Sequence, residues 1–461
     1  MAAVAVVGAG IAGLTAAYRL KQCGMRVVVY EASERTGGTI LTERREGYLA
    51  ELGPSSVAAP SPAVRDFLAE LRLDASLLVA SPAARHRYIV RKGKLVPVPL
   101  SPPQLLTTRL LSNGAKLAVF GEPLVEAGDS PMEESVATFI RRRFNQEVLD
   151  YIANPAVAGI YAGDPEQLSL RHALPRLHAL ERSHGSVLKA MAGMRRERKD
   201  HDDGGIGPGS PVTFRQGLQE LPDALARELQ SAVRLRAPVT QVRRAPNGWA
   251  VGAAFQPTEL YDGVVLASPA HCADEIDLDF AGGEKLKTLG SIVHPAVAVL
   301  ALGFRREDVS HPLTGFGFLA PEVERRHVLG VIFSSTLFAG RAPEGHVLLT
   351  AFVGGARNPD LANADLATLT ARVTDDLRTL LGVQGEPTFR AFHLWPKAIP
   401  QYALGYGRFK EIMYEAERNH PGLALAGAYR EGIAMGDVIA SAEEAARRVA
   451  EQIGPGAPEA A

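Results

Sequence analysis

"VAVVGAGIAGLTAAYRLKQCGMRVVVYEASERTGGTI", residues 4–40, decides the fold of this chain. It begins within a short β-branched run, Ala3–Val7, which predicts a buried strand. Apolar residues then recur at helical spacing over residues 11–20, and a second β-branched run follows at Arg26–Tyr30. Strand, turn, helix and strand in this order predict the start of a parallel α/β sheet.

The turn between the first strand and the helix contains glycines at 8, 10 and 13. Gly8 permits a tight turn, Gly10 lets the backbone approach a pyrophosphate, and Gly13 lets the helix pack closely on the strand. The free N–H groups at the start of the helix then face the phosphates. The unit therefore predicts a Rossmann-type dinucleotide site.

Glu31 directly follows the second strand, where an acidic side chain can accept hydrogen bonds from ribose hydroxyls. NAD and FAD both fit the unit up to this point. Arg35 can reach a diphosphate, and Gly37 and Gly38 leave backbone free to lie against a ligand that extends beyond it. These residues favour FAD, and the alternative is a glycine-rich turn with a solvated arginine.

Composition sets limits on domain number and on partners. With 461 residues, 46% of them apolar, the chain is expected to form two or three domains. A net charge of −1 provides no general attraction for nucleic acid. Two cysteines, Cys23 and Cys272, and twelve scattered histidines predict neither a disulfide framework nor a metal site. With no signal-like N-terminus, a cytoplasmic protein is expected.

The rest of the chain alternates helical and strand-like patterns. A helix is predicted over 61–78, a hairpin that turns at Lys92-Gly93, a helical stretch over 102–188 and a charged, glycine-rich surface loop over 194–211. Strands follow from 233 onward, with one helix, Leu366–Leu381, among them.

The C-terminal segment predicts a second contact with the cofactor. A strand is expected to end at Gly427, and Asp437 is expected to cap an amphipathic helix that ends at Ile453. The positive end of that helix would favour a reduced, anionic isoalloxazine. The alternative is an ordinary strand-to-helix crossover.

Several motifs together resemble the flavin amine oxidase and protoporphyrinogen oxidase superfamily, and within it the oxygen-dependent protoporphyrinogen oxidases. Beside residues 8–38, these motifs are AGAYREGIAMGDVI (426–439), LWPKAIPQY (394–402), RYIVRKGKLVPVP (87–99), GIYAGDPEQLSL (159–170), GFGFLAP (315–321) and FVGGARN (352–358). The similarity runs nearly from end to end. One departure is Gln216-Gly217, where the family usually has two glycines.

The resemblance implies an α/β and α+β fold with a Rossmann-type FAD-binding domain of the p-hydroxybenzoate hydroxylase type, a mixed α+β substrate domain and a helical insert. The expected ranges are 1–58, 210–285 and 395–455 for the FAD-binding domain, 59–84 and 286–394 for the substrate domain, and 85–209 for the helical insert.

The resemblance also implies roles for individual residues. The expected FAD contacts are Gly8, Gly10, Gly13, Glu31, Arg35, Gly37, Gly38, Val239, Trp395, Gly427, Gly436, Asp437 and Val438. The expected substrate contacts are Arg87 for a propionate, Leu319, Ile332 and Phe352 against the macrocycle, and Gly159 and Gly163 along the same cavity. No metal and no catalytic side chain is expected, since the flavin carries the chemistry.

The activity that the resemblance implies is oxidation of protoporphyrinogen IX by dioxygen, with hydrogen peroxide as product. Coproporphyrinogen III is the alternative substrate. More distant alternatives are an amine oxidase, with Tyr402 and Tyr429 as members of an aromatic cage, and a non-catalytic binder related to Rab GDP-dissociation inhibitors. Cations at the cavity would distinguish the two porphyrinogens, and the sequence leaves open whether Arg44, Arg45, Lys92 or Lys94 face inward.

As partners, the resemblance suggests a second copy of the chain, a ferrochelatase that takes over the product and the inner face of the cell membrane. Residues 101–120 could present Leu110 and Leu111 to that membrane beside Arg109 and Lys116. The alternative is that these leucines pack inside the helical insert.

Overall fold

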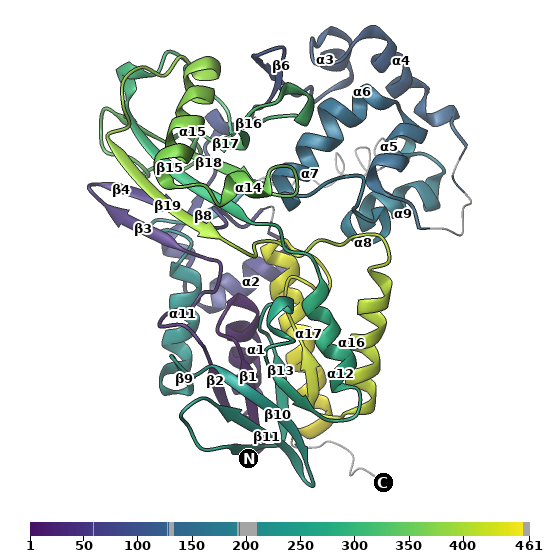
Figure 1. The fold of residues 1–461 in the computed structure, drawn as a ribbon, viewed down its shortest axis with the longest axis vertical. Helices are drawn as coiled ribbons and strands as arrows, with labels where there is room; N and C mark the ends of the chain where they lie inside the picture. Colours follow the sequence, from purple (N-terminus) through teal and green to yellow (C-terminus); the bar gives the residue numbers. More distant parts are fainter. Residues whose placement is uncertain (59, 127, 129–132, 191–192, 194–209, 455–461) are drawn as a thin grey trace.

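The structure, a computed structural model, describes residues 1–454 apart from 59, 127, 129–132, 191–192 and 194–209. Figure 1 shows three regions: a region at the bottom that contains β1 (Ala3–Val7) and α17 (Met435–Ile453) and is expected to bind the nucleotide, a large sheet at the upper left and a group of helices at the upper right.

A five-stranded parallel sheet is the centre of the nucleotide-binding region. Its strands, in spatial order, are β20 (Leu423–Leu425), β13 (Gly263–Leu266), β1 (Ala3–Val7), β2 (Arg26–Tyr30) and β9 (Val233–Arg234). Both faces are covered, so its central strands β1 and β13 are apolar and fully buried. Since β20 pairs with β13 and β13 with β1, the sheet brings the two ends of the chain together.

Two long helices lie against each other on this sheet. α1 (Ile11–Gln22) packs against α17 (Met435–Ile453), and Figure 1 shows them side by side. α11 (Glu220–Leu229) packs against α1, and α16 (Gly407–Asn419) contacts β20. The first turn of α1 and the first turn of α17 thus share one apolar core.

A smaller sheet extends the same region. Its strands are β12 (Glu259–Tyr261), β11 (Gly248–Ala253), β10 (Val239–Ala245) and β14 (Asp277–Asp279). α12 (Gly283–Lys287) contacts β14 and α16.

A seven-stranded mixed sheet forms the second region. Its strands, in order, are β19 (Phe389–Trp395), β15 (Val297–Arg305), β18 (His346–Gly354), β17 (Val328–Ile332), β16 (Gly317–Leu319), β6 (Arg87–Arg91) and β7 (Lys94–Pro97). Alternate residues of β15 point to opposite faces. Ala298 and Leu300 pack in one core with α15 (Leu366–Leu381), whereas Val297 and Val299 pack with α7 on the other face.

The third region is a helical insert. Its helices are α3 (Pro102–Thr107), α4 (Asn113–Gly121), α5 (Val136–Arg143), α6 (Gln146–Val148), α7 (Asn154–Tyr161), α8 (Leu170–Ala173) and α9 (Pro175–His184). Arg143 and Glu122 are fully buried inside it and form an ion pair. A π-helical turn, Leu149–Ala153, precedes α7.

Two predicted boundaries differ from the structure. The hairpin at 87–97, expected in the helical insert, extends the seven-stranded sheet because β6 pairs with β16. The helix predicted over 61–78 ends early: α2 spans Pro62–Glu70, and Arg72 has a left-handed φ of 57°. The chain then forms β5 (Leu77–Val79), which pairs with β8 (Val212–Phe214).

The assignment of 59–84 to the substrate domain is also wrong for α2. Phe67 and Leu68 are buried in the core shared by α1 and α17, so α2 packs with the nucleotide-binding region. The following segment, at Leu78 and Ala84, packs against the substrate sheet near Phe338. The predicted surface loop, apart from residues 210 and 211, lies outside the described residues.

Candidate active site

The first glycine loop joins β1 to α1 in a conformation that excludes side chains. Gly8 has φ +105°, and a Cβ on it would lie 2.9 Å from the carbonyl oxygen of Ala267. A Cβ on Gly13 would lie only 1.9 Å from the carbonyl oxygen of Gly8. Gly10 is the N-cap of α1 and makes no side-chain cap. The N–H groups of the first turn can therefore bind a phosphate.

The second glycine loop lies directly against the first. The backbone N–H of Gly37 donates to the carbonyl oxygen of Ala9 at 2.8 Å. Gly37 and Gly38 both have positive φ, and a Cβ on Gly38 would lie 3.2 Å from the Cα of Gly10. Gly10, which is half-buried, and Gly38, which is exposed, thus place bare backbone side by side, as a bound dinucleotide requires.

Glu31 joins the same surface from the end of β2. Its carboxylate accepts the backbone N–H of Ala9 at 2.7 Å and that of Ser33 at 2.9 Å. The segment expected near the adenine lies beside it, since the N–H of Ala237 donates to the carbonyl of Glu31 at 2.8 Å. Val239 follows two residues later at the start of β10.

Arg35 braces the second glycine loop. Its guanidinium donates to the carbonyl oxygens of Ile40 at 2.8 Å and Gly38 at 2.5 Å. Burial lowers the pKa of Arg35, and the nearby Glu31 opposes that shift. These bonds leave other N–H groups of the guanidinium for a diphosphate, and that role stays a prediction.

The C-terminal segment reaches these loops on the same face of the sheet, where α17 packs against α1. Gly427 follows β20 with φ +146°, and Val438 lies in the core that contains Ala9. A Cβ on Gly436 would lie 3.7 Å from Cγ2 of Val64, at ordinary van der Waals distance. Ala434 and Asp437 on either side of Gly436 are exposed, so the start of α17 is accessible from solvent.

Asp437 is not the cap of α17, contrary to the prediction. The helix starts at Met435 and Ala434 is its N-cap, so Asp437 lies within the first turn. Burial raises the pKa of this carboxyl, while Arg176 and the backbone N–H of Ala434 oppose the shift. Asp437 thus accepts the backbone N–H of Ala434 from within the first turn of the helix, and does not occupy the N-cap position.

Trp395, at the end of β19, is hydrogen-bonded to a segment that pairs with Leu41, just after the second glycine loop. Its indole N–H donates to the carbonyl oxygen of Leu52 at 2.7 Å, and the N–H of Leu52 donates to Leu41 at 2.8 Å. The ring of His393 lies 4.1 Å from the Trp395 ring between centroids. Trp395 is therefore placed at the junction of the two regions.

The predicted macrocycle contacts share one face of the seven-stranded sheet. Leu319 is paired with Gly330, and Gly330 with Phe352, so side chains on this row point the same way. Ile332 lies two residues along β17 and therefore points to that face as well. This is the face that packs toward α7.

Arg87 belongs to the same face. It pairs with Gly317, which in turn pairs with Ile332. Its guanidinium lies 5.1 Å from the ring centroid of Phe316, and within the described part of the chain it forms no ion pair. Arg91, on the same strand, is instead bound to Glu147 at 2.6 Å.

Glycines of α7 and its C-terminal end let the helical insert approach this face. A Cβ on Gly159 would lie 2.7 Å from Cδ2 of Leu319, and one on Gly163 would lie 2.3 Å from Oε1 of Gln401. Ala162 has a left-handed φ of 49° and ends the helix. Gly159 thus lies against Leu319 and Gly163 against Gln401, and the contact of both glycines with a substrate stays a prediction.

The other cations considered for the cavity are engaged elsewhere or exposed. Arg45 donates to the carbonyl of Arg390 at 2.7 Å, and Lys94 is exposed. The turn at Lys92 is bound to Glu324 through backbone N–H groups. Among these cations, Arg87 is the one that the sheet register places in line with Ile332, on the same face as Leu319 and Phe352.

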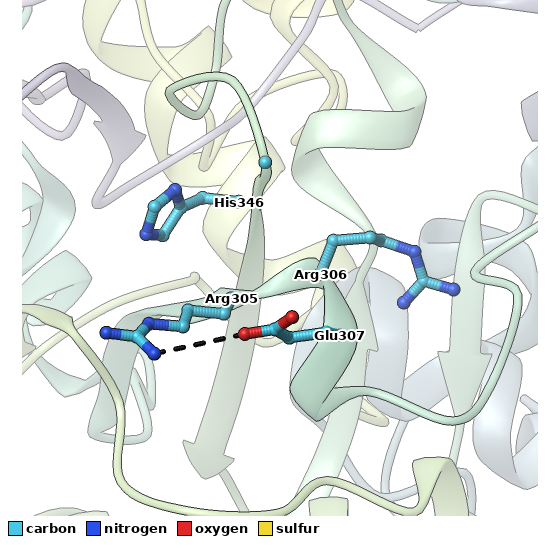
Figure 2. Close-up of a pocket in the computed structure, with 5 residues that line it drawn as sticks. Arg305, Arg306, Glu307 and His346 are labelled. Carbon is cyan, nitrogen blue, oxygen red and sulfur yellow. Dashed lines mark ion pairs between the residues drawn. The ribbon is translucent and has the colours of Figure 1, made fainter.

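A hollow of about 510 Å³ lies far from these residues, at the outer ends of β15 and β18. Its lining includes Arg305, Glu307 and His346, and Arg305 and Glu307 form an exposed ion pair of 3.8 Å. Figure 2 shows that Arg306 points away from this pair. The hollow is an open, charged surface feature and not part of the site.

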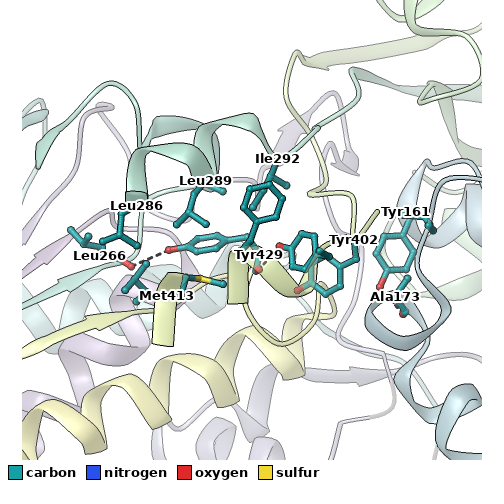
Figure 3. Close-up of a cluster of buried hydrophobic side chains, with 14 of the residues drawn as sticks. Tyr161, Ala173, Leu266, Leu286, Leu289, Ile292, Tyr402, Met413 and Tyr429 are labelled. Carbon is teal, nitrogen blue, oxygen red and sulfur yellow. Dashed lines mark hydrogen bonds between the residues drawn. The ribbon is translucent and has the colours of Figure 1, made fainter. Parts of the chain in front are cut away.

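Sequence analysis missed a group of tyrosines beside the C-terminal segment. Tyr402 and Tyr429, the candidate cage members, are both buried, and each donates its hydroxyl to a backbone carbonyl. Tyr402 donates to Ala428 and Tyr429 donates to Leu266, the second bond being drawn in Figure 3. The rings of Tyr402 and Tyr406 are stacked 4.3 Å apart. The four-residue spacing of Tyr402 and Tyr406 was the available signal.

The paired leucines suggested for a membrane are buried, at 0% exposure for Leu110 and 4% for Leu111. The alternative, packing inside the insert, is therefore correct. Among the described residues, no helix has the length and apolar character that crossing a membrane requires.

Known proteins are similar to this one over nearly the whole chain. Residues 11–450 match the family model for flavin containing amine oxidoreductases. The chain is 34% identical to protoporphyrinogen oxidase 2 of Arabidopsis thaliana over 96% of this chain and 92% of that protein. It is 28% identical to coproporphyrinogen III oxidase of Staphylococcus aureus over 97% and 98% of the two chains.

Among solved structures, a protein from Exiguobacterium sp. 255-15, provisionally named protoporphyrinogen oxidase, has a TM-score of 0.80 at 24% identity over 97% of this chain and 98% of that one. This likeness shows a shared fold. The glycine loops, the acid at the end of β2 and the matches over the whole length agree, and the chain therefore belongs to the flavin containing amine oxidoreductase family, as a flavin-dependent oxidoreductase.

Proposed function

We propose that this chain binds FAD and catalyses the six-electron oxidation of protoporphyrinogen IX to protoporphyrin IX, with dioxygen as acceptor and hydrogen peroxide as product. The observation that carries the proposal is the substrate face of the seven-stranded sheet. Apolar Leu319, Ile332 and Phe352 share it with Arg87, which has no ion-pair partner in the described chain. Protoporphyrinogen oxidases among the relatives support it.

The two glycine loops fit FAD in particular. Gly10 and Gly38 leave a continuous surface of bare backbone, and Glu31 lies at its edge for ribose hydroxyls. The start of α1 supplies N–H groups for a diphosphate. The accessible first turn of α17 at Gly436 would favour negative charge on a flavin ring.

A porphyrinogen is a large apolar ring with carboxylates at one edge, so it needs apolar walls and fixed cations. The face from Leu319 to Phe352 supplies a wall, and α7 at Gly159 closes against it. Arg87 supplies a planar, permanently charged group for a propionate. Protein residues therefore bind and orient the substrate and keep water away from it.

When bound, the flavin supplies the redox chemistry by accepting hydride equivalents from the methylene bridges of the ring. Of the predicted substrate contacts, Leu319, Ile332 and Phe352 are apolar and Arg87 is permanently charged. None of these side chains can act as a general base. The protein then contributes by holding the substrate in position relative to the flavin.

The test is the flavin spectrum of the purified, FAD-loaded protein before and after anaerobic addition of protoporphyrinogen IX. Loss of the oxidised flavin absorbance is expected, followed in air by porphyrin fluorescence and hydrogen peroxide. A flavin that stays oxidised with both porphyrinogens would overturn the proposal. Polyamines and monoamines added in the same assay test the amine oxidase alternative, which the buried, hydrogen-bonded Tyr402 and Tyr429 disfavour.

Coproporphyrinogen III is the second candidate substrate, because coproporphyrinogen III oxidases are also among the relatives. It has four carboxylates where protoporphyrinogen IX has two. Among the described residues, Arg87 is the cation without an ion-pair partner that the register places in line with Ile332 on this face, and one such cation favours the substrate with fewer carboxylates. Initial rates with equal concentrations of the two porphyrinogens decide between them.

We also propose peripheral contact of the helical insert with an anionic membrane. Leucines on α3, on α4 and just after it are exposed, at 62% for Leu106, 73% for Leu117 and 88% for Leu124. Lys116 lies among them and donates to the carbonyl of Leu106 at 3.0 Å. Exposed leucines beside a cation suit an interface between water and lipid.

A further inference from the structure

The loop that follows β20, residues 426–434, is held by side chains of residues 402–406 and of α16. Tyr402 donates its hydroxyl to the carbonyl of Ala428 at 2.6 Å, and Tyr406 donates to the carbonyl of Tyr429. The next residue, Arg430, is bound by the carboxylate of a residue on α16. Consecutive residues of the loop are thus fixed by hydrogen bonds from outside the sheet.

The carboxylate that binds Arg430 belongs to Glu417, and both side chains are buried. The guanidinium makes two contacts with it, at 2.6 and 2.8 Å. Glu417 also accepts the N–H of Leu425 at 2.9 Å, so it ties the end of β20 to the loop. Arg448 of α17 contacts the same carboxylate.

The segment that carries the two tyrosines is itself anchored on its other side. The N–H of Ser169 donates to the carbonyl of Tyr402 at 2.8 Å, and the N–H of Leu404 donates to Gln167 at 2.9 Å. Both contacts come from the helical insert. The tyrosines are therefore attached to a fixed support, between the insert and the loop.

Burial keeps the hydroxyl groups of Tyr402 and Tyr406 protonated, so that they can donate hydrogen bonds. It raises the pKa of both Tyr402 and Tyr406, and the neighbouring tyrosines shift each pKa in the same direction. Each hydroxyl has a carbonyl acceptor, and a buried carbonyl that loses its donor is costly. Figure 3 shows the rings of Tyr402 and Tyr429 in one row with Tyr161.

We propose that Tyr402 and Tyr406 are positioning residues, which hold the loop after β20 in the conformation that faces the flavin ring. This inference rests on the proposed function for the identity of the bound group. The loop leads directly into the first turn of α17, so its position sets where the N–H groups of that turn lie. Dipoles fixed in advance stabilise developing negative charge most effectively.

The experiment compares Tyr402→Phe and Tyr406→Phe with Tyr48→Phe. Each variant removes one buried hydroxyl and keeps the ring. Tyr48 is the matched control because its hydroxyl is bonded to Thr388 Oγ1 at 3.0 Å, on the seven-stranded sheet. Hydrogen exchange of residues 426–432 is measured on the purified protein, and the flavin reduction potential is measured on the FAD-loaded protein by equilibration with a reference dye.

We expect exchange in this loop to become about tenfold faster in Tyr402→Phe and Tyr406→Phe, with bound FAD retained. The potential should shift to more negative values, because the reduced flavin loses part of its stabilisation. Tyr48→Phe should match the wild type in both. Wild-type exchange and potential in both tyrosine variants would overturn the inference.

Neither measurement needs a porphyrinogen. If the wild-type flavin is reduced by neither porphyrinogen, the proposed function fails, and the exchange and potential data still decide the role of the tyrosines. If only one single variant folds, that variant decides the outcome for its own hydroxyl.

Discussion

The backbone N–H of Gly37 donates to the carbonyl oxygen of Ala9 at 2.8 Å, and this bond fixes the second glycine loop against the first. The two loops are separated by β2 in sequence. Their contact creates one surface of bare backbone from Gly10 to Gly38. Flavin binding should therefore depend on the absence of side chains at both loops.

Gly38→Ala should weaken FAD binding by about tenfold, because its Cβ would lie 3.2 Å from the Cα of Gly10 and its φ of +59° suits glycine. Gly24→Ala is the matched control. It has a similar φ of +78° but nothing within 4 Å of the new Cβ. FAD titration followed by flavin fluorescence measures the effect, and equal affinities for the two variants would contradict it.

Arg87→Ala should raise KM for protoporphyrinogen IX by about tenfold, because a propionate loses its charged partner. Flavin content should not change. Arg305→Ala, on the same sheet but at its outer end and 62% exposed, should behave as the wild type. Steady-state kinetics measures both, and an unchanged KM in Arg87→Ala would remove Arg87 from the substrate site.

Glu122→Gln should lower the free energy of unfolding by about 3–5 kcal/mol, because it leaves the buried Arg143 charge uncompensated. Glu166→Gln breaks the exposed pair with Arg141 and should cost under about 1 kcal/mol. Urea unfolding measures both. If the two variants lose similar amounts of unfolding free energy, burial does not determine how much each ion pair stabilises the fold.

The same carboxylate gives a pH dependence. Burial alone would raise the pKa of Glu122, but hydrogen bonds from Ser186, Arg143 and backbone N–H groups lower it overall. A lowered acid pKa contributes stability above the unfolded value of 4.5, and this is lost as pH falls through the folded pKa. Unfolding of Glu122→Gln should therefore depend less on pH below about 4.5 than unfolding of the wild type.

His294 should make the wild type less stable in mild acid. Burial lowers its pKa from 6.5 to about 4, with a smaller contribution from His271, so the unfolded chain binds the proton more readily than the folded one. Stability should fall as pH decreases from 6.5 toward 4, by about 2 kcal/mol by pH 5. His294→Gln should remove this part of the decline in urea titrations, and an identical pH profile would refute the assignment.

Leu106→Asp combined with Leu117→Asp should reduce sedimentation with anionic liposomes, because a charge replaces each exposed apolar side chain. Leu260→Asp is the control, since Leu260 is 69% exposed on the small sheet of the nucleotide-binding region. Unchanged sedimentation of the double variant would argue against membrane contact by these leucines.

The sequence by itself determined the local units. The strand, glycine turn and helix at residues 3–22 follow from β-branched and helical periodicity, and Leu366–Leu381 was predicted with the bounds that the structure gives. Both patterns are local, because each residue's environment is set by neighbours a few positions away. The flavin-dependent oxidoreductase family was likewise evident from short motifs.

Only the tertiary structure decided which units meet. The sequence placed Arg87 in a hairpin but not on the sheet that carries Ile332, because strand pairing is non-local and its register is set by contacts between distant segments. The bonds from Tyr402 and Tyr406 to the loop after β20, and the burial of Leu110, likewise depend on how helices from separate stretches pack. Hydrophobic periodicity reports that a side chain is buried, and packing alone determines its partners.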